Sequence, residues 1–354
     1  MVDSAPLLIY GAYGYTGRLV ASEALAAGLR PILGGRDARV VAAVAEPLGL
    51  DHRATSLDDE RGLDAALEGV RAVLHCAGPF VHTSRAMVDA CLRRGVHYLD
   101  ITGELAVFEA IAARDGEARS CGVTLLPGVG FDVVPSDCLA AHLAGRLPSA
   151  THLALAFRSL GGVSRGTATT AVHNAGSGGA VRRDGRIVRV PAAWRTRRID
   201  FGDGEPLPAV TIPWGDVSTA WHSTGIPNVE VYMAMTPAMR RALVLSRWME
   251  WLLSSGPVRR WLVRRAQSRR PGPSEARRAR GESRLWGEVR DADGRVAISR
   301  LVAPEVYTLT ARTAIASAVR VLAGGVATGF QTPSRAFGAD FILEQQGMRR
   351  EDVA

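Results

Sequence analysis

The sequence predicts an α/β chain with an N-terminal doubly wound parallel sheet and a second α+β domain built on a largely antiparallel sheet. Two observations support this prediction. Up to about residue 130, short apolar runs alternate with segments of helical periodicity, the order of parallel strands joined by helices. After Pro135, strand-like segments follow one another across Gly, Pro and Asp turns, mostly without helices between them. A length of 354 residues suits two domains.

The first domain is predicted from apolar runs and their flanks. The run Leu7–Tyr10 ends in glycines, as a buried parallel strand does, and Val20 and Ala24 give the next segment helical spacing up to Gly28. The strands that we expect are 7–10, 31–36, 52–56, 72–76, 97–101 and 123–126. The helices that we expect between them are 16–27, 38–47, 59–67, 84–93 and 105–118.

The second domain is predicted from its strand-like segments and a few helices. The strands that we expect are 153–157, 187–190, 209–212, 229–234, 285–290 and 295–302. The helices that we expect are 136–147, 239–254, 258–268 and 309–322. The small, polar residues 167–179 suit a helix whose face lines the substrate cavity or, equally, a flexible surface helix. We therefore expect a first domain over 1–135, a second over 136–325, and a C-terminal segment, 326–354, that returns to the first.

Composition excludes several kinds of chemistry. All 43 residues in the Lys+Arg total are arginine, so Schiff-base chemistry, the Walker phosphate loop and a Tyr-x-x-x-Lys pair are ruled out, because each needs a lysine amine. The four cysteines form no CxxC pair, and the eight histidines show no metal-ligand spacing, so we expect no metal. The N-terminus lacks a charged region and a cleavage site, so we expect a cytoplasmic protein.

A glycine-rich loop follows the first predicted strand and opens the first helix. It reads Gly11-Ala12-Tyr13-Gly14-Tyr15-Thr16-Gly17, with glycines where a dinucleotide loop needs a tight turn, an approach to the pyrophosphate and close helix packing. This placement indicates a Rossmann-type domain, although an ordinary turn has the same residues. Arg36 ends the second strand, where Arg favours the 2′-phosphate of NADP(H) over NAD. We expect the neighbouring Asp37 to cap the next helix.

The ends of the later parallel strands are expected to line the same crevice. They carry Cys76, Ala77, Gly78 and Pro79 after the fourth strand, Gly103 after the fifth, and a Gly-rich turn up to Asp132 after the sixth. We predict that the first five of these residues line the nicotinamide pocket. Cys76 is expected to be a small buried hydrophobe rather than a nucleophile, and His75 a core residue.

Several of these segments together resemble the saccharopine dehydrogenase-like oxidoreductases. They are GAYGYTGR at 11–18, AGPF at 77–80, HYLDITGE at 97–104, PGVGFDVVPSD at 127–137 and FQTPSRAFGADF at 330–341. The chain is most similar to the branch of trans-acting enoyl reductases of lipid and polyketide biosynthesis, although the middle, about 180–300, matches loosely. The resemblance implies an NADP-binding Rossmann domain, an α+β substrate domain and reduction of a carrier-bound double bond.

Reduction of a double bond also needs a proton donor. Glu104 and Asp132 rank first because both follow predicted strand ends, and Tyr98 and His173 are further candidates. Each carboxyl has a structural alternative: Glu104 would suit the dipole of the helix that it opens, and Asp132 would hold a loop. Tyr15 would pack on the nicotinamide side or on its own helix.

Net charge is +8, and most of it lies in one segment. Between Arg240 and Arg284 there are thirteen arginines and three glutamates. This segment, with Trp248, Trp251 and Trp261, is a solvated face, a dock for an acyl carrier protein or polyketide synthase, or a peripheral contact with the inner face of a membrane. A nucleic-acid partner is not expected, since the rest of the chain is slightly acidic. A homodimer is left open.

The sequence thus predicts an NADPH-dependent oxidoreductase, an enoyl reductase acting on a lipid or polyketide intermediate. Two alternatives stay open at this stage. One is a dehydrogenase of imines derived from amino acids, for which arginines such as Arg158 and Arg182 would bind carboxylates. The other is a non-catalytic NADP-binding module at a membrane or a synthase.

Overall fold

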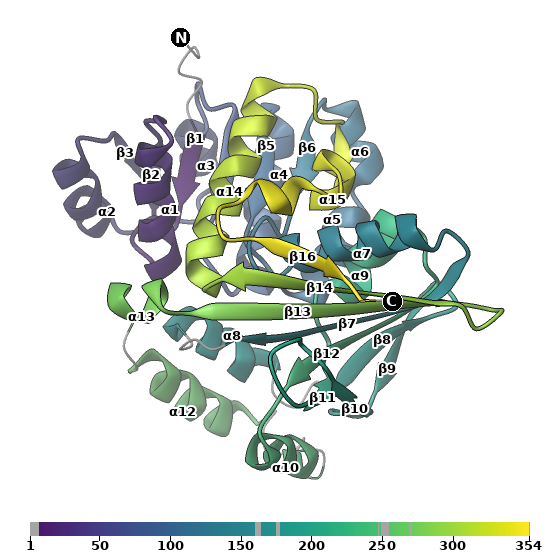
Figure 1. The fold of residues 1–354 in the computed structure, drawn as a ribbon. Helices are drawn as coiled ribbons and strands as arrows, with labels where there is room; N and C mark the ends of the chain where they lie inside the picture. Colours follow the sequence, from purple (N-terminus) through teal and green to yellow (C-terminus); the bar gives the residue numbers. More distant parts are fainter. Residues whose placement is uncertain are drawn as a thin grey trace. The chain divides into compact units, whose positions relative to one another are not determined.

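The computed structural model describes residues 7–159, 164–174, 178–246, 248, 255–268 and 271–353 (Figure 1). The chain forms two compact units. The first ends at Val134 and takes in the later segment Tyr307–Phe337, while the second comprises Pro135–Val306 and Gly338–Ala354. The C-terminal part of the chain therefore passes through both units.

The first unit contains a parallel sheet whose strand order is β15-β6-β5-β4-β1-β2-β3. The strands are β1 (Leu7–Tyr10), β2 (Ile32–Gly35), β3 (His52–Ala54), β4 (Ala72–His75), β5 (His97–Asp100), β6 (Thr124–Leu126) and β15 (Gly329–Phe330). Strand order reverses between β1 and β4, the crevice where open parallel sheets bind ligands. The predicted doubly wound sheet is confirmed.

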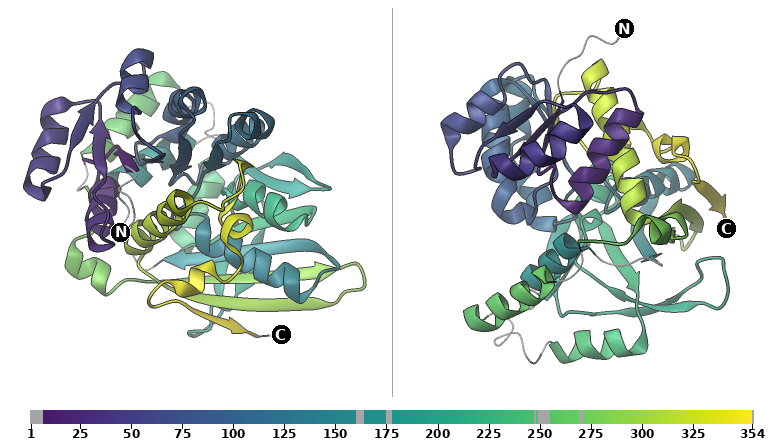
Figure 2. Two further views of the ribbon diagram at one scale, coloured as in Figure 1. Left: turned by 90° about the horizontal axis from the view of Figure 1, so that it is seen from above. Right: turned by 90° about the vertical axis from the view of Figure 1, so that its left-hand side faces the viewer.

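Helices cover both faces of this sheet (Figure 2). One face packs against α1 (Tyr15–Ala26), α2 (Ala38–Ala45) and α14 (Val306–Ala323). The other packs against α3 (Glu60–Ala66), α4 (Phe80–Arg94), α5 (Leu105–Ala112) and α6 (Asp115–Ser120). The single helix predicted over 105–118 is two helices, because the chain leaves helical geometry at Arg114, whose φ is −98° and ψ 12°.

The C-terminal part of the chain divides differently from the expected domains. Helix α14, expected in the second domain, belongs to the first unit, because its buried residues Ala314 and Ala318 share an apolar cluster with Val20 of α1. The segment 338–354, expected to return to the first domain, belongs instead to the second, where β16 (Arg349–Asp352) pairs with β14 (Val296–Pro304). Only 326–337 follows the expectation, through β15 and α15 (Pro333–Phe337).

The second unit contains a mixed sheet, whose main path is β10-β11-β12-β7-β13-β14-β16. Its further strands are β7 (Ala150–Ser159), β8 (Gly179–Arg183), β9 (Arg186–Val190), β10 (Thr196–Ile199), β11 (Leu207–Thr211), β12 (Asn228–Ala234) and β13 (Glu282–Asp291). Strands β7 and β12 are parallel, and the other described pairs are antiparallel. The prediction of a largely antiparallel sheet is confirmed, although β8, β10 and β16 were not predicted.

The two faces of this sheet differ in chemistry because side chains alternate along each strand. One face buries Leu153, Leu155 and Val289, and α7 (Val134–Arg146) lies on it: a Cβ on Gly287 would come 2.5 Å from Leu143. The opposite face carries His152, Ala154, Glu230, Glu288 and Arg290. The remaining helices of the unit are α8 (Arg165–Asn174), α9 (Asp216–Thr224), α10 (Pro237–Ser246), α12 (Gly256–Gln267) and α13 (Glu275–Ala279).

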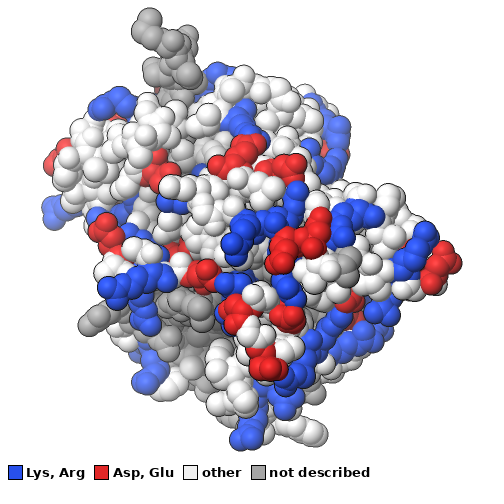
Figure 3. Space-filling model, in the orientation of Figure 1, with Lys and Arg blue, Asp and Glu red and all other residues white. Residues whose placement is uncertain are grey.

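The arginine-rich segment contains α10 and α12. The predicted helix 239–254 is described only to residue 246, and Trp251 and Arg270 lie outside the described residues. Large apolar side chains are exposed here: Trp248 is 81% exposed and Trp261 59%, and Met239 and Leu245 are also exposed. Figure 3 shows arginines along the lower edge of the view, over the second unit. No described helix is long and apolar enough to cross a membrane.

Candidate functional site

The glycine loop joins β1 to α1 and is held against the neighbouring strand β2. The backbone N–H groups of Gly11 and Ala12 donate to Gly34 O at 2.8 and 3.2 Å, and Gly14 N donates to Gly11 O at 3.0 Å. The last residues of β2, Gly34 and Gly35, have no side chains to obstruct this contact. The loop is thus a tight turn that lies directly on the sheet edge.

Two glycines of this loop sit where any side chain would collide with the backbone. Gly11 has φ +85°, and a Cβ there would lie 2.8 Å from Ala77 N in the turn after β4. A Cβ on Gly17 would lie 2.3 Å from Gly11 O. These positions therefore need glycine, one for a left-handed backbone conformation and one so that α1 can pack against the loop.

The N-terminus of α1 is suited to an anion. Its N-cap is Gly14, no side chain makes a capping hydrogen bond, and the first turn contains no acidic residue. The first N–H groups of a helix lack intrahelical partners and carry a partial positive charge, so they bind phosphate. The residues present fit the pyrophosphate of a dinucleotide, as the loop Gly11–Gly17 predicts.

Arg36 lies at the end of β2 with its side chain exposed. Among the described residues, no salt bridge or hydrogen bond of its guanidinium is found, so the group is available for the 2′-phosphate of NADP(H). Asp37 does cap α2, because its carboxylate accepts a hydrogen bond from Val40 N at 3.1 Å. The acidic residue beside Arg36 is therefore engaged by its own helix.

The turn after β4, Cys76–Pro79, lies against the glycine loop through Ala77. Thr83 of α4 holds this turn, since its hydroxyl donates to Ala77 O at 2.7 Å. Burial raises the pKa of the Cys76 thiol to about 12, so the thiol stays protonated and is a poor nucleophile. Ala77, Gly78 and Pro79 are partly or fully exposed and are placed to face a ligand.

His75 is buried at the end of β4. Its Nε2 lies 3.1 Å from the hydroxyl of Thr83, but its Nδ1 has no partner among the described residues. Burial lowers the pKa of His75 to about 3, so the imidazole is neutral. His75 is thus a core residue, as expected, but only one of its two ring nitrogens has a hydrogen-bond partner among the described residues.

Asp100, at the end of β5, ties two strand-end loops together. Its carboxylate accepts hydrogen bonds from Thr102 N and Gly128 N, both at 2.9 Å, and from the hydroxyl of Tyr98 at 2.7 Å. Burial raises the pKa of Asp100 to about 6, and the two backbone hydrogen bonds oppose that rise. Sequence reasoning missed this role, and the signal available was a carboxyl at the end of a buried strand.

Glu104 lies in the loop between β5 and α5, but its side chain caps α4 and not α5. The carboxylate accepts hydrogen bonds from Phe80 N at 2.8 Å and Val81 N at 2.9 Å, in the first turn of α4. It makes no capping bond to α5. Both oxygens of Glu104 are therefore held by backbone N–H groups, an arrangement that supports a structural role.

Asp132 lies in the loop after β6 and is partly exposed. A Cβ on Gly103 would come 2.7 Å from Asp132 Oδ2, so this carboxyl lies directly against the loop after β5. Burial, and then the charge of Glu104, raise the pKa of Asp132 to about 7. Asp132 can therefore hold or release a proton near neutral pH, as a general acid must.

Helix α14 supports this last loop from a distant part of the sequence. The hydroxyl of Thr313 donates to Val129 O at 2.8 Å, and that of Thr310 accepts from Phe131 N at 3.0 Å. The turn before Asp132 is thus held by residues nearly two hundred positions away in the sequence.

The same helix contacts the glycine loop. The ring of Tyr15 lies edge-on against Tyr307 of α14, with centroids 5.1 Å apart, so Tyr15 does not pack on its own helix alone.

The remaining candidates are placed less favourably for chemistry. Tyr98 is fully buried in the core and donates to Asp100, so this structure gives it a positioning role and no exposure to a substrate. The side chain of His173 lies outside the described residues. No group of three or more His, Cys, Asp or Glu suited to a metal occurs among the residues that the structure describes.

Comparison with known proteins identifies the same region. Among curated proteins, the chain is 33% identical over 152 residues to a trans-acting enoyl reductase of Mycobacterium leprae, covering 40% of this chain and 36% of that protein. It is 27% identical over 151 residues to a human saccharopine dehydrogenase-like oxidoreductase, covering 37% and 35%. The chain spans less than half the length of the curated relatives that it matches.

A solved structure extends the likeness in fold to the second unit. The saccharopine dehydrogenase (L-Glu forming) of Saccharomyces cerevisiae, in its apo form, has a TM-score of 0.66 and 12% sequence identity, covering 99% of this chain and all of that one. At such identity the likeness is one of fold alone. The model of the saccharopine dehydrogenase NADP-binding domain matches residues 7–126, which contain the glycine loop, Arg36 and the strand ends. Residues 7–126 are therefore similar to the saccharopine dehydrogenase NADP-binding domain.

Proposed function

We propose that this chain is an NADPH-dependent reductase that uses Asp132 as its proton donor, and that its substrate is an α,β-unsaturated thioester of a lipid or polyketide. The observation that carries the proposal is a carboxyl with a pKa of about 7 on the loop after β6, directly beyond the residues 7–126 that match an NADP-binding domain. The names of the mycobacterial relatives, trans-acting enoyl reductases, favour a C=C bond as the reducible group.

The cofactor would be bound by backbone groups and one arginine. The N–H groups at the start of α1 would hold the pyrophosphate, and Arg36 would pair with the 2′-phosphate. The turn Ala77–Pro79 and Gly103 would leave room for the nicotinamide. When bound, NADPH supplies a hydride equivalent.

Asp132 would complete the reduction. A C=C bond conjugated to a thioester takes up a hydride equivalent at the β-carbon and a proton at the α-carbon. The carboxyl of Asp132 would give that proton and become a carboxylate, which solvent reprotonates. Glu104 assists as a positioning residue, because its charge raises the pKa of Asp132 and its hydrogen bonds fix the loop beside it.

Two other functions compete with this one. An imine dehydrogenase would use the same cofactor and proton donor but would need cationic groups for the substrate carboxylates. A non-catalytic NADP-binding module would bind the cofactor without turnover. Screening of substrates distinguishes the imine dehydrogenase from the enoyl reductase. The Asp132 variant described below distinguishes the non-catalytic module from an enzyme.

The cofactor assignment is tested by titrating the protein with NADPH and NADH and following tryptophan fluorescence. Loss of one charge-assisted hydrogen bond in Arg36→Ala should cost about 1.5–3 kcal/mol in NADPH binding, tenfold or more in Kd, with NADH little changed. The matched control is Arg61→Ala, an exposed arginine of α3, which should bind both cofactors like the wild type. Equal losses for both cofactors in Arg36→Ala would contradict the 2′-phosphate contact.

The proton donor is tested with trans-2-octenoyl-CoA as the probe and NADPH oxidation as the readout. Asp132→Asn should lower kcat by about 100-fold or more while leaving NADPH affinity unchanged. In the wild type, kcat should fall as pH rises through about 7, because the donor must be protonated. Turnover of this probe by Asp132→Asn at the wild-type rate would remove Asp132 from the mechanism.

The arginine-rich segment would bring the enzyme to its substrate. We propose that α10 and α12 lie on an anionic membrane surface, because exposed Trp248, Trp261 and Leu245 are interleaved with exposed arginines, the composition of an interfacial helix. A face that only meets water would not be expected to expose 81% of a tryptophan.

The membrane contact is tested by flotation with phosphatidylglycerol vesicles. The double variant Trp248→Ala/Trp261→Ala should no longer float with the vesicles, whereas retained flotation would contradict this contact. Binding to an acyl carrier protein in place of vesicles would favour the synthase partner.

A further inference from the structure

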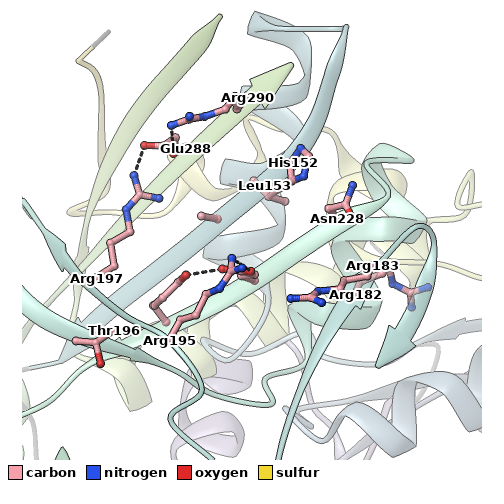
Figure 4. A pocket seen from close by; sticks show the side chains of 13 residues that line it. His152, Leu153, Arg182, Arg183, Arg195, Thr196, Arg197, Asn228, Glu288 and Arg290 are labelled. Atoms are coloured by element: carbon pink, nitrogen blue, oxygen red, sulfur yellow. Dashed lines mark hydrogen bonds and ion pairs between the residues drawn. The ribbon is translucent and has the colours of Figure 1, made fainter. Parts of the chain in front are cut away.

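The second unit contains a cavity of about 690 Å³ on the polar face of its sheet (Figure 4). All the residues that line it belong to this unit. They come from β7, β8, β12 and β13 and from the segment 195–197 at the start of β10. The volume is within the range of small-molecule sites. None of the cofactor residues described above contributes to it.

The floor of the cavity follows from strand register. In one row across the sheet, Glu230 of β12 and Glu288 of β13 both pair with Ala154 of β7, which lies between them. In the next row, Asn228 and Arg290 both pair with His152. The small Ala154 side chain therefore leaves open space between Glu230 and Glu288, whose strands lie about 10 Å apart across the sheet.

The walls of the cavity are strongly cationic. Its lining includes five arginines against two glutamates. The five arginines are Arg182, Arg183, Arg195, Arg197 and Arg290. Guanidinium groups in such number, around a cavity with only two carboxylates, create a positive potential that favours anions.

The two glutamates hold the arginines in place rather than neutralise the whole cavity. Arg195 Nη1 lies 2.7 Å from Glu230 Oε1. Arg197 and Arg290 both pair with Glu288, and Figure 4 shows them approaching it from opposite sides. These ion pairs order the long side chains, so that less entropy is lost when a ligand binds.

Trp194 contacts both Arg183 and Arg195, the second of which also pairs with Glu230. The guanidinium carbons of Arg183 and Arg195 lie 4.4 and 4.2 Å from the centroid of the Trp194 ring, so both groups stack on one indole. A stacked guanidinium keeps its edge N–H groups available for oxyanions. No hydrogen bond of the Arg183 guanidinium is found among the described residues, which leaves its donors for a ligand.

We propose that this cavity is a binding site for a small multivalent oxyanion, a molecule that carries two or more phosphate or carboxylate groups. An excess of guanidiniums spread around one cavity matches separated anionic groups better than a single one. The planar donor forks of arginine suit both phosphate and carboxylate oxygens. The site is independent of the proposed reductase function, because its test involves neither NADPH nor turnover.

The test is calorimetric titration of the full chain, at constant ionic strength, with inorganic pyrophosphate and, separately, with citrate. We expect wild-type protein to bind at least one of them, and the tighter one identifies the anionic group. The double variant Arg183→Gln/Arg195→Gln should weaken binding at least tenfold, about 1.4 kcal/mol. Ala154→Leu, which fills the floor without changing charge, should weaken it similarly.

The control is Arg186→Gln/Arg189→Gln, which removes the same charge from exposed positions of β9 outside the cavity. This variant should bind like the wild type. The proposal fails if neither anion binds wild-type protein, if the control loses as much affinity as the cavity double variant, or if Ala154→Leu binds normally while its far-ultraviolet circular dichroism is native.

Discussion

The proposed NADP site and the proposed anion cavity would present positive charge to a ligand in two different ways. The first uses backbone: helix N–H groups at α1, glycines at two obligatory positions, and one free arginine. The second uses side chains: five arginines, four of which contact two glutamates or Trp194. The cofactor site depends on a few backbone atoms that are closely packed at Gly11 and Gly17, whereas the cavity distributes its charge over five arginine side chains. Single substitutions should therefore damage the first much more than the second.

The largest expected effect is at Gly17, where a Cβ would lie 2.3 Å from Gly11 O. In Gly17→Ala the loop must move away from α1, and NADPH affinity should fall about 100-fold or more, roughly 3 kcal/mol. Fluorescence titration measures it. The control is Gly116→Ala in α6, where a Cβ meets nothing within 4 Å, and affinity should be unchanged. A normal NADPH Kd in Gly17→Ala would mean that the loop is not a rigid cradle.

The next effect concerns Asp100, which holds the loops beneath the site. Asp100→Ala leaves Thr102 N, Gly128 N and the Tyr98 hydroxyl buried without their acceptor, so the free energy of unfolding should fall by about 3 kcal/mol or more. Tyr98→Phe removes only one of the three hydrogen bonds and should cost about 1 kcal/mol. Urea unfolding compares them, and equal losses would show that Asp100 does not act as the common anchor.

A smaller effect should appear as a pH dependence of stability. Because the pKa of Asp132 is raised to about 7, the folded protein binds more protons than the unfolded chain between about pH 4 and 7, so wild-type stability falls as pH rises through that range. Asp132→Asn cannot titrate. Its Tm should match the wild type only below about pH 4, where Asp132 is neutral in both the folded and the unfolded chain, and should exceed it by an increasing margin up to pH 8.5. A Tm difference independent of pH would contradict the raised pKa.

The smallest effect is expected in the cavity. Arg197→Gln removes one partner of Glu288, but the guanidinium is partly exposed and Arg290 also pairs with that glutamate. The free energy of unfolding should therefore change by no more than about 1 kcal/mol. A loss of several kcal/mol in urea unfolding would show that the ion pairs of the cavity serve stability, and would weaken the contrast between the two sites.

The two regions also differ in how far their sequences reveal them. The glycine loop and Arg36 follow β1 and β2 within thirty residues, and their expected chemistry depends on local spacing, so the sequence alone is enough to propose them as a cofactor site. The cavity brings together β7, β8, β12 and β13, whose residues are separated by more than a hundred positions. Arg182 was considered as a carboxylate-binding residue from the sequence, but the cavity itself could not be predicted. Register, not spacing, places Glu230 and Glu288 on either side of Ala154.

The same distinction applies to the two candidate carboxyls. Their positions after strand ends predicted both Glu104 and Asp132 as candidates. Which of them is held by backbone could not be predicted, because Glu104 accepts its hydrogen bonds from α4, 23 and 24 residues earlier in the chain. Burial beside Gly103 and Glu104 then raises the pKa of Asp132. Both outcomes depend on contacts between different strand ends.

By itself, the sequence determined the order of the strands β1 to β6 of the first unit, the glycine loop, the NADP preference expected of Arg36 and the excess of arginine at 240–284. These follow from periodicity, turn chemistry and charge, which act between neighbours along the chain. Only the tertiary structure decided that α14 supports the Asp132 loop, that residues 338–354 join the second sheet, and that five arginines surround one cavity. Those features arise from burial and strand register, which join residues that are far apart in the sequence.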